Sequence, residues 1–219
     1  MELDSLNAAF VIDTFLLLLI GIGPKIALVP FLEATKQMPE ATKRRVVRKM
    51  LTTAATVALL LLVLGGLLTR LLHFSPGALG VASGIILLII AVTMVLGQHE
   101  GNRDSHSAEA EAKADDPMQV AVFPLAVPYL LNPAGIVILV TTSAEAASVA
   151  VFAVFLGILI LVLALDAVVF RWAVQVSSHL DASRMLVTEK VFGFLLAALG
   201  VQLVLDGLSD VGVIHLTSH

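Results

Sequence analysis

Long apolar runs separated by short charged stretches make up most of the chain. Four runs, 51–69, 71–98, 117–144 and 146–165, contain no Asp, Glu, Lys or Arg. A helix needs roughly 20 apolar residues to cross a bilayer, so each of these runs is a candidate span. Two weaker runs, 8–32 and 191–208, carry one or two charges. The runs are apolar on every side, unlike the alternating strands of a membrane barrel. The pattern predicts an all-α polytopic membrane protein of about six transmembrane helices.

Composition supports a lipid environment. Of the 219 residues 58% are hydrophobic and only 14% are charged, and the mean hydropathy is +1.00. A domain dissolved in water could not cover so much apolar surface. Glu2 and Asp4 stand where a removable signal sequence has positive residues, so we expect the first run to remain as a span. The chain has no cysteine, which excludes disulfides and thiolate metal sites.

The positive charges are unevenly distributed. Six of the 13 Lys and Arg residues lie in the stretch 33–50, namely Lys36, Lys43, Arg44, Arg45, Arg48 and Lys49. The positive-inside rule places this loop in the cytoplasm, which puts both termini outside an inner (plasma) membrane. The basic loop is expected to contact the anionic lipid of the bilayer, and no nucleic-acid partner is expected.

The chain also resembles itself. A shift of 109 residues aligns Gly23-Pro24 with Asn132-Pro133 and Gly84 with Gly193. We therefore expect two three-helix repeats, 1–96 and 118–219, joined by a disordered cytoplasmic linker at 97–117 that is rich in Ala, Glu, Asp and Ser. Because each half crosses the membrane an odd number of times, the second half enters from the opposite side and the repeat is inverted, as in secondary transporters. The alternative is a chance alignment of apolar helices.

Prolines and glycines interrupt the first and fourth runs at repeat-equivalent positions. Proline removes a backbone donor and clashes with the preceding turn, so both helices should break. Freed backbone in a membrane must be buried in protein or line a wet cavity. The amino end of a half-helix carries partial positive charge and suits a carboxylate, whereas a carboxyl end suits an ammonium group. The two breaks therefore favour a small zwitterionic or neutral substrate. A simple packing kink is the alternative. The candidate substrate-binding residues are Gly21, Gly23, Pro24, Lys25, Asn132, Pro133, Ala134, Gly135, Thr141 and Thr142.

Two charges fall inside predicted spans. Counted from the expected cytoplasmic ends of their helices, Lys25 and Asp166 have a similar depth. Because an unpaired charge in the hydrocarbon costs several kcal/mol, we predict an ion pair between them that gates or titrates during transport. The alternative is that Lys25 extends its ammonium to the cytoplasmic interface and that Asp166 faces water.

Small residues recur in the third and sixth runs, which lets helices approach closely and predicts contact between the halves or between subunits of a homo-oligomer. They are Gly80, Ser83 and Gly84, and Gly193, Ala197 and Gly200. No catalytic triad, phosphate-binding glycine loop or metal-binding His pair is recognisable, so neither an enzyme nor a cofactor is predicted.

The order of these motifs resembles the MarC family over nearly the whole chain. The pieces are Gly23-Pro24, Pro30-Phe31-Leu32, the stretch 75–84, Asn132-Pro133-Ala134-Gly135 and Gly200-Val201-Gln202. The resemblance implies a six-span inner-membrane protein, with some relatives assigned to transport of small neutral amino acids coupled to protons or sodium.

This chain departs from that pattern at the first break, where relatives usually have Asp or Asn and this sequence has Gly23. With Lys25 beside the break, a fixed cation would repel Na⁺, so proton coupling is favoured over sodium coupling. The expected function is a secondary transporter or exporter of a small neutral solute that works by alternating access. A passive channel or a non-transporting scaffold is the alternative.

Overall fold

The structure is a computed structural model that describes residues 8–96, 116–145, 148–176 and 182–214. Over these residues the chain is helical, and its only extended pairing is one isolated bridge. The predicted linker, apart from its last two residues, and the chain's terminal residues lie outside this part. The elements are α1 (Ala8–Gly21), α2 (Pro24–Ala34), α3 (Glu40–Leu72), α4 (Pro76–Leu96), α6 (Pro117–Val120), η1 (Ala121–Leu130), α7 (Pro133–Glu145), α8 (Val149–Val176) and α9 (Ala182–Asp210).

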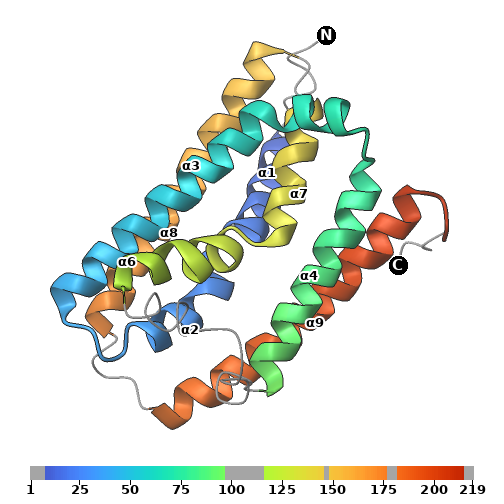
Figure 1. Cartoon of the computed structure of the whole chain (residues 1–219). Coiled ribbons are helices and arrows are strands. Elements are labelled where there is room, and N and C mark those ends of the chain that lie inside the picture. The colour runs from blue at the N-terminus through green and yellow to red at the C-terminus, as the bar shows by residue number, and fades with distance from the viewer. Residues whose placement is uncertain (1–7, 97–115, 146–147, 177–181, 215–219) are drawn as a thin grey trace.

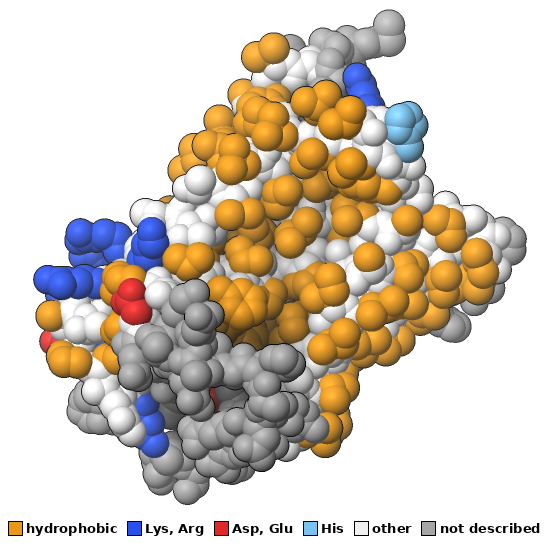
Figure 2. Space-filling view, viewed as in Figure 1, with side chains coloured by type: hydrophobic (Ala, Val, Ile, Leu, Met, Phe, Trp, Pro, Cys, Tyr) orange, Lys and Arg blue, Asp and Glu red, His pale blue; other side chains and the backbone are white. Residues whose placement is uncertain are grey.

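Four of the described helices are long and apolar enough to cross a membrane: α3, α4, α8 and the stretch Gly193–Asp210 of α9. Their outer faces carry large apolar side chains that are exposed, among them Leu67, Ile89, Leu161 and Phe194. Figure 2 shows such side chains across most of the visible face, with Lys and Arg gathered mainly toward one end. Apolar surface of this extent is stable only against lipid. The prediction of an all-α, polytopic membrane protein is confirmed.

The first and fourth predicted spans are built from shorter helices on either side of a break. The helix α1 ends at Gly21 and α2 begins at Pro24, while η1 ends at Leu130 and α7 begins at Pro133. Each new helix starts with proline, which fits the first position because its missing N–H needs no partner there. The breaks expected at these two prolines are therefore present.

A further irregularity precedes the second break. Phe123 and Val127 have extended backbone angles inside η1, and each of them precedes a proline. The ring of a proline disfavours helical angles in the residue before it, so two such pairs in succession explain why this segment is not a regular α-helix.

The helices α4 and α9 pack against each other along one side of the molecule, and α3 and α8 contact each other on the opposite side (Figure 1). The broken helices lie between these pairs: α7 contacts α4, and α2 contacts α9. Glycines allow the close approach of α4 and α9, because a Cβ at Gly84 would lie 2.6 Å from the carbonyl oxygen of Gly200. Lys190 of α9 donates to the carbonyl of Met94 near the end of α4 at 2.8 Å. The small residues thus serve contact between two helices of one chain.

Candidate functional site

The two helix breaks meet in the interior of the molecule. Ile22 and Leu131 pair in an antiparallel bridge, and neither side chain is exposed. The amide of Asn132 donates to the carbonyl of Gly21 at 3.1 Å, and the amide of Ile22 donates to Leu18 at 2.6 Å. Backbone groups released by one break are thus satisfied partly by the other. This meets the requirement that irregular backbone at membrane depth be enclosed by protein.

Asn132 joins the two breaks through its side chain as well. Its Oδ1 accepts a hydrogen bond from the amide of Gly135 at 3.0 Å, which caps the amino end of α7. Its Nδ2 donates to the carbonyl of Ile20 near the carboxyl end of α1 at 2.9 Å. The residue is fully buried. Asn132 was expected to hydrogen-bond substrate, and the structure directs both ends of its amide to the protein itself.

Gly21 and Gly135 bring the backbones of the broken helices into direct contact. A Cβ built on Gly21 would lie 2.7 Å from the backbone nitrogen of Gly135, and one built on Gly135 would lie 2.6 Å from the carbonyl carbon of Gly21. Backbone therefore packs directly on backbone, with room for neither a side chain nor a ligand between these two residues. Any solute at this level must bind beside the contact and not within it.

The amino ends of the two half-helices that follow the breaks differ. The start of α7 is capped by Asn132, whereas Gly23 precedes α2 in an extended conformation and provides no side chain as a cap. Pro24 has no amide hydrogen, but Lys25 and Ile26 present theirs at the first turn, where the helix dipole favours an anion. Lys25 is itself exposed. This end of α2 is the most cationic part of the crossing.

The predicted ion pair between Lys25 and Asp166 is not formed. Asp166 is fully buried, and within the described part of the chain its two carboxylate oxygens have no hydrogen-bond partner. It lies on the same face of α8 as Phe170, one turn further on, whose ring meets Phe31 of α2 edge-on with centroids 5.3 Å apart. Lys25 is exposed on α2, whereas Asp166 is buried. Similar depth alone did not bring the two charges together.

The other candidates line the start and the middle of α7. Pro133 and Ala134 are buried at its first turn. The hydroxyl of Thr141 donates within its own helix, 3.0 Å from the carbonyls of Val137 and Ile138. Thr142 is 8% exposed and lies on the buried side of the same helix. The hydroxyl of Thr141 is thus satisfied within its own helix, and Thr142 is packed against protein.

One contact near this site was not predicted. The hydroxyl of Ser143 in α7 accepts a hydrogen bond from the amide of Gly66 in α3 at 2.8 Å, and a Cβ on Gly65 would lie 2.8 Å from the Cα of Val140. The adjacent glycines in the apolar run 51–69 were the available signal, because small residues mark close helix contacts in membranes. This contact fixes α7 against α3.

A family model described as MarC family integral membrane protein matches residues 8–211. A UPF0056 membrane protein of Methanocaldococcus jannaschii is 28% identical over 179 residues, covering 81% of this chain and 85% of that protein. The UPF0056 membrane protein YvbG of Bacillus subtilis is 27% identical over 205 residues, covering 91% and 94%. YhcE of Escherichia coli, also a UPF0056 membrane protein, is 26% identical over 165 residues, covering 74% and 75%. No solved structure matches the chain.

Proposed function

Because the chain belongs to the MarC family of integral membrane proteins, we propose that it is a secondary transporter or exporter of a small neutral solute, of the size and charge of a small amino acid. The observation that carries the proposal is the meeting of two broken helices at Ile22 and Leu131 inside the protein. Broken helices that face each other near mid-membrane are where secondary transporters bind substrate and coupling ions. Rocking of one half against the other about this crossing gives alternating access.

Alternating access of this kind rests on an inverted repeat, and the contacts support one. Ile22 and Leu131 are themselves separated by the repeat shift of 109 residues, as expected for equivalent residues that meet on a two-fold axis. The shift of 109 residues also relates α4 to α9 and α7 to α2. As an inverted repeat requires, α4 contacts α7 and α9 contacts α2. In the contact between α4 and α9, Gly84 lies against Gly200. The shift relates these two residues to Gly193 and Ala91, which also lie against each other.

The amino end of α2 is the proposed carboxylate site. Its first amides have no side-chain cap, and the exposed ammonium of Lys25 adds a positive charge. Asp166 is the proposed proton carrier. An ionised carboxylate without a partner is energetically costly in the membrane, and binding a proton is the simplest way to neutralise its charge. Sodium coupling is not part of the proposal, since Lys25 would repel the ion.

The proposal includes an orientation in the plasma membrane. The stretch that begins α3 carries Arg44, Arg45, Arg48 and Lys49, all exposed, whereas Arg70 near the other end is the only Lys or Arg in the rest of that helix. The positive-inside rule places the basic end in the cytoplasm. Since α1 begins and α9 ends toward the other end of the molecule (Figure 1), both termini face outward.

Flux through proteoliposomes tests this function. Purified protein is reconstituted, and uptake of radiolabelled glycine, alanine and serine is measured with and without a pH gradient. We expect saturable uptake that competes among these solutes and rises against a concentration gradient when protons are supplied. Lys25→Gln should raise KM with little change in kcat, while Lys49→Gln, an exposed charge far from the crossing, should change neither. Solute flux that does not saturate with concentration would indicate a passive channel. If neither the solutes nor protons cross the membrane, the protein would instead be a non-transporting scaffold.

A further inference from the structure

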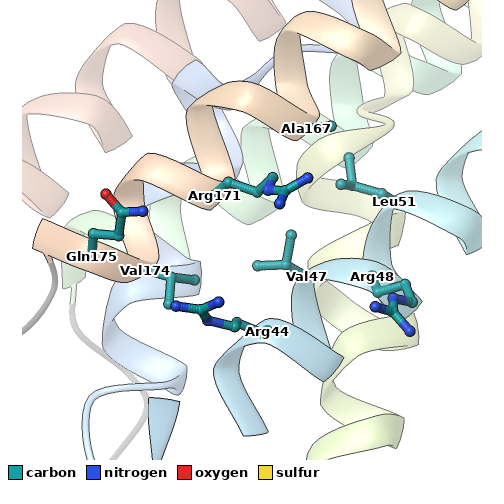
Figure 3. Close-up of a pocket in the computed structure, with 8 residues that line it drawn as sticks. All are labelled: Arg44, Val47, Arg48, Leu51, Ala167, Arg171, Val174 and Gln175. Carbon is teal, nitrogen blue, oxygen red and sulfur yellow. The ribbon is translucent and has the colours of Figure 1, made fainter. Parts of the chain in front are cut away.

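A cavity of about 320 Å³ opens between α3 and α8, away from the crossing of the broken helices. Its volume is at the lower end of the range for small-molecule sites, about 300–1,000 Å³. One wall is formed by α3 and the other by α8, which belong to different halves of the chain. The lining residues are Arg44, Val47, Arg48, Leu51, Ala167, Arg171, Val174 and Gln175 (Figure 3).

The lining contains three positive charges and no negative one. Arg44 and Arg48 are one turn apart on α3, and Arg171 lies on the facing helix α8, with the apolar side chains of Val47 and Leu51 also at the cavity (Figure 3). Arg44 donates to Glu40 at 3.1 Å, but that pair is exposed and holds the arginine only weakly. Within the described residues Arg48 and Arg171 have no carboxylate partner. Three guanidinium groups around one cavity repel each other unless an anion joins them.

The neighbouring residues place the cavity at the level of lipid headgroups. Trp172 follows Arg171 directly and is 63% exposed, as tryptophans are at the boundary between hydrocarbon and water. Val168, one turn earlier on α8, is 65% exposed and fits the hydrocarbon side of that boundary. The mouth of the cavity therefore lies where phosphate groups of the bilayer are abundant.

The positions that the repeat shift relates to these arginines carry no charge. The repeat shift of 109 residues relates Arg44 and Arg48 to Ala153 and Gly157 of α8, and Arg171 to Leu62 of α3. Ala153 and Gly157 are also exposed, and a Cβ built on Gly157 would meet nothing within 4 Å. A cluster of arginines is therefore present at only one of the two equivalent ends of the α3–α8 pair.

We infer that this cavity binds a phosphate-bearing anion, which joins α3 and α8 through Arg48 and Arg171, with Arg44 released from Glu40 as a third contact. The planar guanidinium fork matches phosphate oxygens in paired hydrogen bonds, and Gln175 adds an amide donor. The phosphate is carried by an anionic phospholipid or is free in the cytoplasm. Because the walls come from the two halves, a bound anion ties these helices together at their basic ends. The inference is independent of the proposed transport.

Binding to the purified full chain tests it. Short-chain phosphatidylglycerol, short-chain phosphatidylcholine and inorganic phosphate are each titrated into the protein in uncharged detergent, and Tm and lipid retention in native mass spectrometry are recorded. The variant is Arg48→Gln/Arg171→Gln. The matched control is Arg45→Gln/Lys49→Gln, which removes the same charge from the same end of the molecule at positions outside the cavity.

We expect phosphatidylglycerol, but not phosphatidylcholine, to raise the Tm of the wild type and of the control by about 5 °C near saturation. The cavity variant should bind at least about tenfold more weakly, since two charge-assisted hydrogen-bond partners are lost. A matching response to inorganic phosphate would identify free phosphate as the ligand. Equal weakening in the variant and the control, or no response of the wild type to either anion, would overturn the inference.

Discussion

Ile22 and Leu131 lie 109 residues apart in the chain and pair across one antiparallel backbone bridge where two helices break. Asn132 adds two hydrogen bonds beside the bridge, from its amide to the carbonyl of Gly21 and from its side chain to the carbonyl of Ile20. A crossing held by backbone groups is rigid, because these groups are fixed by the helices on either side. It joins the two broken spans at one buried point of the molecule.

The contact of Gly21 with Gly135 makes the first prediction. Gly21→Ala and Gly135→Ala each place a methyl group against backbone of the other helix, which should lower the free energy of unfolding by about 1–3 kcal/mol. Gly157→Ala is the matched control, since a Cβ there meets nothing within 4 Å and a helical Gly→Ala change stabilises by up to about 1 kcal/mol. Chemical unfolding in detergent measures all three. Equal stability of the three variants would refute the close contact.

Asn132→Ala removes the cap of α7 and the donor to Ile20 together. We expect a loss of about 2–4 kcal/mol, because each buried group left without its partner costs about 1–3 kcal/mol. Thr141→Val is the control, since its hydroxyl donates only within its own helix and the change should cost less than about 1 kcal/mol. Thermal unfolding followed by circular dichroism distinguishes them. A neutral Asn132→Ala would mean that this amide does not join the breaks.

Asp166→Asn tests the proposed proton carrier. Replacing a buried carboxylate that has no hydrogen-bond partner in the described residues with a neutral amide should leave Tm unchanged or raise it. Solute uptake driven by a pH gradient should be lost, while exchange without a gradient continues. Asp206→Asn is the control, because that carboxylate is exposed and accepts a hydrogen bond from Gln202 at 2.7 Å. Retention of proton-driven uptake in Asp166→Asn would remove this residue from the mechanism.

The pair of α4 and α9 allows a comparison within one helix. Gly84→Ala brings a Cβ to 2.6 Å from the carbonyl oxygen of Gly200, whereas a Cβ on Gly80 meets nothing nearer than 3.4 Å. Gly84→Ala should therefore lower Tm by several degrees, corresponding to about 1–3 kcal/mol, and Gly80→Ala should be neutral or stabilising. A thermal melt of each variant is sufficient. The reverse order would show that α4 and α9 cross at a different register.

The apolar runs of the sequence determined the class of the protein and most of its helices. Runs 51–69 and 71–98 correspond to α3 and α4, because an uncharged stretch of that length has no stable place except across the hydrocarbon. Pro24 and Pro133 determined where the first and fourth spans break, since the loss of a backbone donor acts locally in any surroundings. The small residues of the third and sixth runs likewise indicated a close helix contact, but not whether it lies within one chain or between subunits.

The tertiary structure decided what each of these features contacts. Lys25 and Asp166 have similar depths along their helices, yet the rotation of α2 and α8 about their axes leaves one exposed and the other buried. Asn132 was recognisable as a polar residue at a break, but only the crossing of the chains showed that its amide bonds to Ile20 and Gly135. Arg171 joined the arginines of α3 around one cavity for the same reason. Helix formation depends on neighbours in sequence, whereas the rotation and pairing of helices depend on side chains far apart in it, and only packing brings these together.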